Sequence, residues 1–156
     1  MADVEQTSTV AASAADVWDR IASFEGVNHE LGPLLHMTAP REIRDIDPEQ
    51  VPLGRRWFRS WILLFRVLPV DYDDLVIVEI EDGRRFLERS SMLTMRVWQH
   101  ERMLEPDGDT LTRVTDRLTF TPRRLVSRRL ARAVVGLLFR HRHKRLAAYF
   151  SGSASR

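Results

Sequence analysis

The spacing of hydrophobic and polar residues near the N-terminus predicts one strand followed by two short helices. Residues 4–10 alternate loosely between apolar and polar side chains, which is typical of a strand. Ser13 then has the character of a helix N-cap, and apolar residues recur at helical spacing across a predicted helix at 14–23. We expect Gly26 to end this helix and a second short helix to span 28–35.

The middle of the chain is rich in β-branched and aromatic residues, which favours strands. The expected strands are 55–65, 75–81, 84–91, 95–104 and 111–120. Asp82-Gly83 predicts a tight two-residue hairpin turn, because this dipeptide accepts the positive φ that such a turn requires. A second turn is expected at 106–109, where a proline, a glycine and two aspartates stand together.

After Pro122 the pattern changes to that of one long helix, expected over 123–150. Strands in a run, with helices separated from them, indicate an α+β protein rather than a parallel α/β sheet. We therefore expect a curved antiparallel sheet of about six to seven strands wrapped around the long helix, which would cover its buried face. Residues 1–150 would form a single domain and 151–156 a polar C-terminal tail.

The composition limits the chemistry. The chain of 156 residues has no cysteine, so disulfides, thiolate metal sites and a cysteine nucleophile are excluded. Its first residues lack the basic-then-apolar order of a secretory signal, and no apolar run is long enough to span a bilayer. A cytoplasmic location is therefore expected.

Charge is distributed unevenly along the chain. Residues 1–121 contain 14 Arg and 22 Asp and Glu, a net charge of −8, whereas residues 122–156 contain nine Arg, one Lys and no acid, a net charge of +10. Two interpretations stay open: a basic helix lying on an acidic body, or a contact with an anionic membrane surface through Arg128, Arg129 and Arg132. Nucleic acid is not an expected partner, because the aromatic residues are not interleaved with the basic ones.

Four short motifs are distributed along the predicted elements. Thr9–Trp18 reads TVAASAADVW, Trp98–Arg102 reads WQHER, Thr115–Leu118 reads TDRL and Phe139–His143 reads FRHRH. Together with the order of elements, these motifs resemble a bacterial ligand-binding branch of the START-like superfamily, also called SRPBCC or helix-grip, which includes polyketide cyclases, dehydrases and lipid-transport proteins. The resemblance covers nearly the whole chain. It implies a helix-grip fold that holds a hydrophobic ligand between the sheet and the last helix, and it does not choose between an enzyme and a carrier.

His100 and Asp116 are the first candidates for chemistry. A turn centred near Asp107-Gly108 would place them opposite each other on neighbouring strands, with their Cβ atoms about 5 Å apart. Asp116 shares a strand face with apolar residues, so its carboxylate needs a partner, which His100 or Arg102 would supply. Such a pair is either an acid/base pair in an apolar cavity or a buried pair that orients the strands.

We expect the ligand cavity to be lined by residues of the sheet and of the last helix. These candidates are Trp57, Trp61, Trp98, His100, Arg102, Asp116, Phe120, Leu138 and Phe139. For the aromatic residues the alternative is plain core packing. The sequence does not say which face of strand 55–65 is turned inward.

Other site classes are not expected. His141 and His143 stand two residues apart on a predicted helix and do not face one another, so no metal is expected. The chain has no glycine-rich phosphate loop and no serine nucleophile elbow, and we expect no cofactor.

Three functions agree with these observations. The leading hypothesis is the binding or carriage of a hydrophobic small molecule, lipid-like or polyketide-like, between the sheet and the C-terminal helix. The second is an enzyme of the polyketide cyclase or dehydratase type that uses His100 and Asp116. The third is a peripheral membrane module that uses the basic helix. The oligomeric state is left open.

Overall fold

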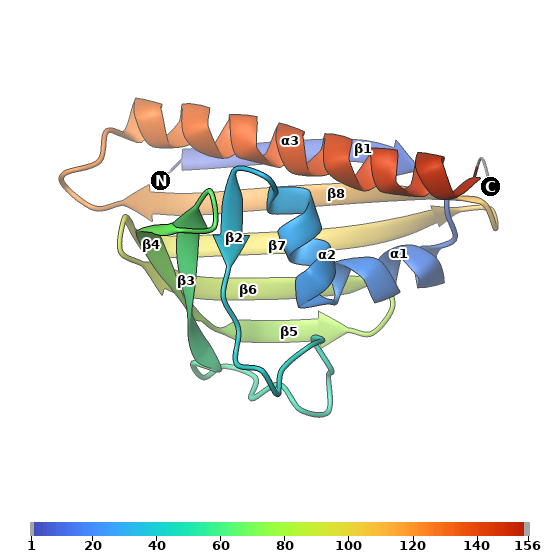
Figure 1. The fold of residues 1–156 in the computed structure, drawn as a ribbon, viewed down its shortest axis with the longest axis horizontal. Coiled ribbons are helices and arrows are strands. Elements are labelled where there is room, and N and C mark those ends of the chain that lie inside the picture. The colour runs from blue at the N-terminus through green and yellow to red at the C-terminus, as the bar shows by residue number, and fades with distance from the viewer. Residues whose placement is uncertain (1, 155–156) are drawn as a thin grey trace.

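The computed structural model describes residues 2–154 and shows an antiparallel sheet curved around a long C-terminal helix (Figure 1). Within these residues the strands are β1 (Ala2–Val10), β2 (Leu35–Met37), β3 (Phe58–Leu64), β4 (Leu68–Leu75), β5 (Ile77–Glu81), β6 (Arg85–Met92), β7 (Met95–Asp107) and β8 (Leu111–Pro122). The helices are α1 (Ala14–Ile21), α2 (Phe24–Leu31) and α3 (Arg128–Ala154). The α+β helix-grip architecture expected from the sequence is confirmed.

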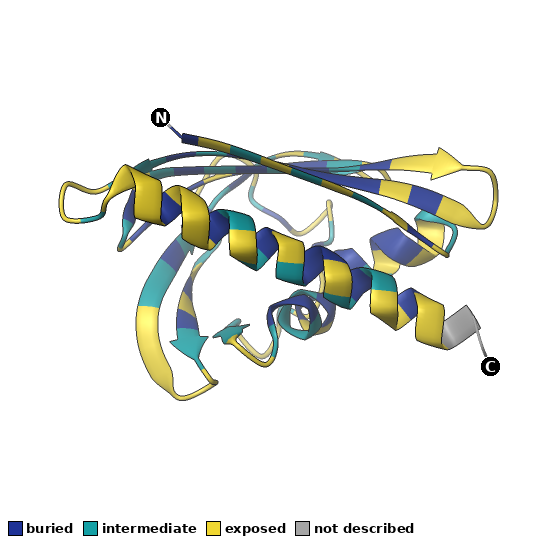
Figure 2. Cartoon of the chain, turned by 90° about the horizontal axis from the view of Figure 1, so that it is seen from above, coloured by how far each residue is buried: buried dark blue, intermediate teal, exposed yellow. Residues whose placement is uncertain are grey.

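The strands follow the order β1-β8-β7-β6-β4-β3-β2, and β5 also pairs with β6. The segment expected as one strand at 75–81 therefore belongs to two strands, which are separated by Val76. The N–H of Val76 donates to the hydroxyl of Ser90 at 3.1 Å, so a side chain takes the place of a ladder bond at this break. The break lets the sheet bend. Seen from above, the sheet curls beside α1 and α2, and α3 lies across the opening of the curve (Figure 2).

Helices α1 and α2 are each started by a serine cap. The hydroxyl of Ser13 accepts from the N–H of Asp16 at 3.2 Å, and that of Ser23 accepts from the N–H of Gly26 at 3.0 Å. The prediction that Gly26 ends the first helix is wrong, because α1 stops at Ile21 and Gly26 lies in the first turn of α2. The glycine serves a close approach instead: a Cβ at this position would lie 1.8 Å from the backbone oxygen of Arg20.

Helix α3 begins later and ends later than the sequence predicts. The N–H of Arg123 donates to the backbone oxygen of Thr94 at 2.9 Å, which keeps that residue tied to the sheet until a short turn leads into the helix. The helix continues to Ala154, so the first residues of the expected tail at 151–156 are helical, and residues 155–156 lie outside the described part. In residues 2–154 no helix is both long enough and apolar enough to cross a bilayer.

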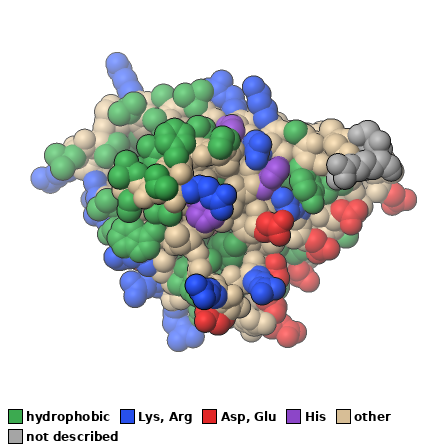
Figure 3. Space-filling model, viewed as in Figure 1, with side chains coloured by type: hydrophobic (Ala, Val, Ile, Leu, Met, Phe, Trp, Pro, Cys, Tyr) green, Lys and Arg blue, Asp and Glu red, His purple; other side chains and the backbone are tan. Residues whose placement is uncertain are grey.

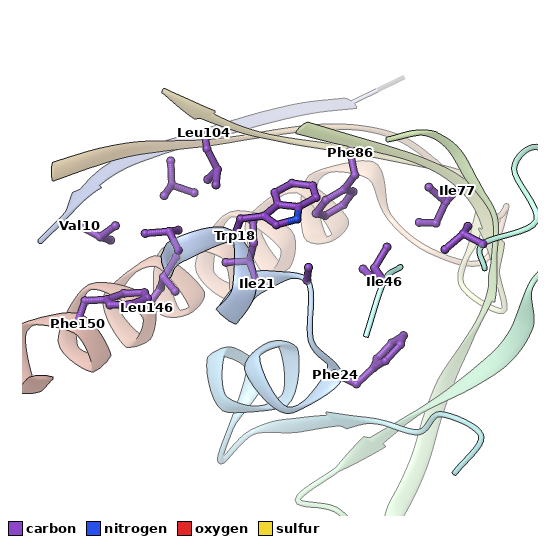
Figure 4. Close-up of a cluster of buried hydrophobic side chains, with 14 of the residues drawn as sticks. Val10, Trp18, Ile21, Phe24, Ile46, Ile77, Phe86, Leu104, Leu146 and Phe150 are labelled. Carbon is purple, nitrogen blue, oxygen red and sulfur yellow. The ribbon is translucent and has the colours of Figure 1, made fainter. Parts of the chain in front are cut away.

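Two groups of buried apolar side chains fill the interior. The larger group joins α1, the sheet and the C-terminal half of α3, and its members point toward one another in Figure 4; they include Val10, Trp18, Ile21, Phe24, Ile77, Phe86, Leu104, Leu146 and Phe150. The second group lies at the other end of α3 and includes Trp98, Leu118, Phe120, Val135 and Phe139. Residues that face the interior alternate with exposed ones along the sheet and along α3 (Figure 2).

The structure decides the inward face of β3. Ser60 and Ile62 are buried, whereas Trp61 is 44% exposed and packs on Tyr72 on the outer side of the sheet. The β5–β6 turn also differs from its prediction, because Glu81 pairs with Arg85 and leaves a loop of three residues rather than two. Gly83 takes the positive φ of 77° in that loop, as three-residue hairpins require.

Replacement of Gly26 tests the close approach of α1 and α2. Gly26→Ala should lower the free energy of unfolding by about 2 kcal/mol or more, because the added methyl group overlaps backbone rather than a movable side chain. Gly136→Ala is the matched control: it has open space around it within α3 and should raise stability by about 0.5–1 kcal/mol. Urea denaturation followed by circular dichroism measures both variants, and equal effects would contradict the close approach.

Candidate functional site

The register of β7 and β8 sets the centre of the candidate site. Arg102 pairs with Asp116, and His100 pairs with Leu118, so the prediction that His100 stands directly opposite Asp116 is wrong by two residues. The cause is the turn, in which Asp107 pairs with Leu111 and leaves a three-residue loop that starts at Gly108. A shift of two residues preserves the face of the sheet, so His100 still reaches Asp116 diagonally.

The carboxylate of Asp116 is fully buried and is held by three basic side chains, two from β7 and one from α3. His100 Nε2 lies 2.6 Å from Oδ1. Arg102 binds both oxygens, with Nε donating to Oδ1 at 2.8 Å and Nη2 donating to Oδ2 at 2.6 Å. His143, on α3, places Nε2 at 2.7 Å from Oδ2. The bidentate contact of Arg102, together with the two imidazoles, compensates the negative charge of Asp116, which would otherwise be costly to bury.

Glu30 of α2 joins the same network. Its Oε2 accepts from Arg102 Nη1 at 3.0 Å, and its Oε1 lies 2.9 Å from Arg102 Nη2 and 3.4 Å from Arg142 Nε. On the far side, the hydroxyl of Ser8 lies 2.5 Å from His143 Nδ1. We call the six charged or titratable residues of this network the Asp116 cluster: Glu30, His100, Arg102, Asp116, Arg142 and His143.

The sequence analysis did not identify Glu30, Arg142 and His143 as site residues, although the sequence contains a sign of their burial. Arg142 and His143 follow Phe139 by three and four positions and precede Leu146, so they stand on the helix face that carries buried apolar residues. Glu30 stands three positions after Val27 and next to the buried Leu31 in α2. In each case a charged residue at a core-facing position was the available sign.

Charges in the Asp116 cluster stabilise one another against burial. Burial raises the pKa of Asp116, but Arg102 and His100 outweigh it and hold that pKa well below the ordinary 3.8. Burial lowers the pKa of His100, but Asp116 and Glu88 together raise it above the ordinary 6.5. For Glu30, burial is likewise outweighed by Arg102 and Arg142, which lower its pKa. The histidine therefore favours its cationic form and the two carboxyls favour their anionic form.

A second pair of carboxyl groups lies beside His100. Glu88 Oε1 accepts from the hydroxyl of Ser90 at 2.8 Å, and Glu88 Oε2 is 3.7 Å from His100 Nδ1. Asp73 is buried next to Glu88, and burial together with the charge of Glu88 raises the pKa of Asp73 well above 3.8. Despite burial, the pKa of Glu88 is lowered by its hydrogen bond with His100. One carboxyl thus favours its protonated form and the other its ionised form.

Two small cavities lie between the sheet and the helices. The first, of about 90 Å³, is lined by Leu31, Leu35, Met37, Ile62, Asp73, Glu88, Met92, Trp98, His100, Leu138, Phe139 and Arg142. The second, of about 60 Å³, shares Met37, Glu88, His100 and Arg142 with it and also touches Arg102. Apolar walls with a few convergent polar groups are the usual make-up of a small-molecule site.

The predicted site residues separate into three groups. Trp98, His100, Leu138 and Phe139 line the larger cavity, and Arg102 lines the smaller one. Asp116 and Phe120 are fully buried behind these walls. Trp57 packs against the larger apolar group, and Trp61 is exposed on the outer face of β3, so neither tryptophan lines a cavity as the sequence analysis expected.

An open groove of about 610 Å³ lies at the surface between α2, α3 and the β3–β4 hairpin. Two of its arginines already have structural partners: Arg145 Nε donates to the backbone oxygen of His29 at 3.0 Å, and Arg20 pairs with Glu25 at 3.3 Å. The groove is larger than the two interior cavities but lacks their convergent buried groups, so we place the candidate site in the interior. Within residues 2–154, no group of three or more His, Cys, Asp or Glu side chains is arranged to hold a metal ion.

Comparison with known proteins agrees with this fold, and the class that the fold defines is the START-like, helix-grip class. The family model described as "Domain of unknown function (DUF8410)" matches residues 8–150, and the chain belongs to that family. No curated protein matches the sequence.

Solved structures of similar fold include a START superfamily protein from Mycobacterium smegmatis. It is 13% identical, with a TM-score of 0.69 over 96% of this chain and 97% of the other. The Zhui aromatase/cyclase from Streptomyces sp. R1128 is 14% identical, with a TM-score of 0.69 over 96% and 93% of the two chains. DynU16, from the dynemicin biosynthetic locus, is 18% identical, with a TM-score of 0.63 over 96% of this chain and 47% of the other. At these identities the likeness is one of fold alone.

Removal of Arg102 should destabilise the protein strongly. Arg102→Met leaves Asp116 and Glu30 buried with too few partners, and we expect a loss of about 3–5 kcal/mol in the free energy of unfolding. Arg117→Met on the neighbouring strand is the control, because Arg117 is 56% exposed and its pair with Glu5 should contribute less than about 1 kcal/mol. Chemical denaturation compares the two, and similar losses would mean that the Asp116 cluster does not hold the interior together.

Proposed function

We propose that the protein binds a hydrophobic small molecule in the interior between the sheet and α3. The observation that supports this function is the larger cavity, whose lining combines apolar residues with Asp73, Glu88, His100 and Arg142. Apolar walls supply affinity and a few placed polar groups supply orientation. The similarity of fold to a START superfamily protein and to an aromatase/cyclase supports the same kind of use.

The size of the cavity limits the ligand. A cavity of about 90 Å³ is smaller than the roughly 300–1,000 Å³ of sites for drug-sized ligands, and engineered apolar cavities of about 150 Å³ bind benzene. As it stands, the cavity therefore suits a molecule smaller than a benzene ring. A longer lipid-like or polyketide-like ligand requires its wall to move outward.

We favour ligand binding over a catalytic mechanism in which His100 and Asp116 act as an acid/base pair. Asp116 is fully buried, lines neither cavity, and has both oxygens occupied by Arg102 and the two histidines. A proton transfer through it would have to disrupt the Asp116 cluster. His100 alone faces the cavities, and a cyclase that relied on the pair would have only one of its two groups in contact with substrate.

A cavity-filling substitution tests the binding site. Leu138→Trp should abolish the binding of xenon, because the larger side chain occupies the cavity that Leu138 lines. Leu137→Trp is the matched control on the next residue, which is 61% exposed and should leave binding unchanged. Amide chemical shifts report binding to each variant, after circular dichroism has shown that each is folded.

Native mass spectrometry of the purified protein, followed by extraction, complements this titration by identifying any bound molecule. Failure of the wild-type protein to bind any apolar probe or to retain any apolar molecule would rule out the proposed function.

Docking on an anionic membrane is a second candidate function, favoured by an exposed apolar surface. We call the following residues the hairpin–helix surface: Phe65, Val67 and Leu68 at the β3–β4 hairpin, and Leu130, Val134 and Leu137 on α3, all of them more than half exposed. Figure 3 shows hydrophobic side chains gathered over these two elements, with Lys and Arg around them and acidic side chains toward the other end of the molecule. Exposed apolar side chains surrounded by basic residues suit the interface of an anionic bilayer.

The charges at the start of α3 support the same use. Arg128, Arg129 and Arg132 stand in its first two turns, and the first turn has no acidic residue. Cations at a helix N-terminus oppose the helix dipole, so these residues do not serve helix stability. A negatively charged partner surface would compensate them.

Vesicle binding tests the hairpin–helix surface. Phe65→Ser with Val67→Ser, and separately Arg128→Glu with Arg132→Glu, should each weaken sedimentation with phosphatidylserine vesicles by about tenfold or more, and added salt should weaken the wild type. Leu53→Ser is the control, because Leu53 is an exposed apolar residue outside this surface. Vesicle binding that is unchanged both by added salt and by Arg128→Glu with Arg132→Glu would exclude this function.

A further inference from the structure

The surface groove between α2, α3 and the β3–β4 hairpin collects basic side chains. Its charged and titratable lining residues are Arg20, Arg66, Arg145, His29, His36 and Glu25. The acid among them, Glu25, pairs with Arg20 at 3.3 Å. Within residues 2–154 neither Arg66 nor Arg145 forms an ion pair, so two positive charges in the groove lack a counter-charge. Figure 3 shows Arg and His side chains on this face directly beside the hydrophobic ones.

Arg145 is anchored at the C-terminal end of α2, with most of its donors unused. Its Nε donates to the backbone oxygen of His29 at 3.0 Å, and its Nη2 lies 3.8 Å from the position that a Cβ would take at Gly32. A guanidinium carries five N–H donors in a planar fork. Four of them have no hydrogen-bond partner within residues 2–154 and are available to a ligand in the groove that Arg145 lines.

Arg66 lines the groove from a turn whose backbone does not suit an arginine. The N–H of Val67 donates to the backbone oxygen of Leu64 at 3.1 Å, so Phe65 and Arg66 form a two-residue hairpin turn. Their φ angles are 50° and 68°, which glycine and asparagine adopt far more readily than phenylalanine or arginine. The guanidinium of Arg66 has no hydrogen bond within residues 2–154. Unfavourable backbone conformations of this kind are concentrated at functional sites.

The segment that follows α2 brings the two arginines to one groove. The N–H of Phe65 donates to the backbone oxygen of Leu34 at 2.9 Å, which fixes the hairpin turn against this segment. The Nη2 of Arg145 approaches the same segment at Gly32, two residues before Leu34. Arg66 and Arg145 are therefore long cationic side chains that border a common space from opposite directions of the chain.

The charges of these arginines also act on the histidines of the groove. Burial and then the charge of Arg66 lower the pKa of His36 below 6.5. Burial, followed by the charges of Arg145 and Arg20, lowers the pKa of His29. Both imidazoles thus favour the neutral form, in which each keeps one N–H donor. A negatively charged ligand would relieve the repulsion among the cations and accept hydrogen bonds from all of these groups.

We infer that this groove binds a phosphate group, with Arg66 and Arg145 as its principal ligands. A phosphate monoester carries about two negative charges at pH 7 and offers three acceptor oxygens, which matches two guanidinium groups without counter-charges. A carboxylate offers one charge and two oxygens. Arginine also suits phosphate by the geometry of its donors. The site lies outside the two interior cavities and is independent of the ligand proposed for them.

Glycerol 3-phosphate is the probe that tests the site on the wild-type protein. It should bind saturably and shift the Nε–H resonances of Arg66 and Arg145 in a titration followed by NMR. Acetate should bind about tenfold or more weakly, because it loses hydrogen bonds to charged donors. Glycerol, which has no charge, should not bind.

Substitutions identify the ligands of the phosphate. Arg66→Asn should weaken binding of glycerol 3-phosphate by about tenfold, whereas its midpoint of unfolding in urea should stay unchanged or rise, since asparagine accepts the positive φ. Arg145→Met should weaken binding similarly, and Arg145→Lys should restore part of it. Arg55→Met is the matched control, because Arg55 is an exposed arginine outside the groove, and it should bind as the wild type does.

A short lipid distinguishes the two sources of such a phosphate. Dihexanoyl phosphatidic acid carries the same phosphate on acyl chains that can contact the exposed Phe65 and Val67. Binding tighter than that of glycerol 3-phosphate, with the difference lost in Phe65→Ser with Val67→Ser, would assign the groove to a lipid headgroup. Equal binding of the two compounds would assign it to a soluble phosphate ester.

Three results would overturn the phosphate site. They are no saturable binding of either phosphate compound by the wild-type protein, acetate as tight as glycerol 3-phosphate, or undiminished binding in a folded Arg66→Asn variant. None of them bears on the binding of an apolar molecule in the interior, which the xenon titration measures separately.

Discussion

A single buried carboxylate, that of Asp116, determines how the main elements of this protein meet. It cannot be left without partners in an apolar interior, and its partners come from β7 through His100 and Arg102 and from α3 through His143. Arg102 extends the network to Glu30 of α2. The docking of the last helix, the register of the central hairpin and the position of α2 therefore all depend on the same charge.

Such a cluster is an inefficient way to stabilise a fold, since apolar residues of similar volume often do as well or better. Its position suggests why it is present. Three members of the cluster, His100, Arg102 and Arg142, line the two cavities. Nε of Arg142, Oε1 of Glu30 and Oδ1 of the nearby Asp73 make no hydrogen bond within residues 2–154. Departures from local stability rules of this kind are expected where a protein has a site to maintain.

Helix α3 departs from the usual distribution of side chains on both its inner and its outer face. Arg142 and His143 lie inside the protein, while Leu130, Val134 and Leu137 lie outside on the hairpin–helix surface. A helix whose role was only to cover the sheet would bury apolar residues, as α3 does with Phe139 and Leu146, and would keep all of its charged residues outside. Its interior charges belong to the candidate ligand site, and its exterior apolar residues, beside the arginines of its first turns, belong to the candidate membrane surface. The two proposed functions therefore use different faces of one element.

Patterns along the chain predicted the fold class and the order of the helices and of all strands except β2 and β4. They also predicted that His100 or Arg102 is a partner of Asp116, and in the structure both are. Alternation, helical spacing, Ser13 as a cap and the glycine turns are local signals, and they act over a few residues. Resemblance along the whole chain added the helix-grip topology. The involvement of Glu30, Asp73, Glu88 and His143 was decided only by the tertiary structure, because each meets its partners from a distant part of the chain. The same holds for Trp61, whose side of the sheet depends on which face of β3 is covered, and for Gly26, whose role is the approach of a neighbouring helix. The residue opposite Asp116 was predicted wrongly, because a turn centred one residue further along the chain shifts the pairing by two positions across the whole β7–β8 hairpin.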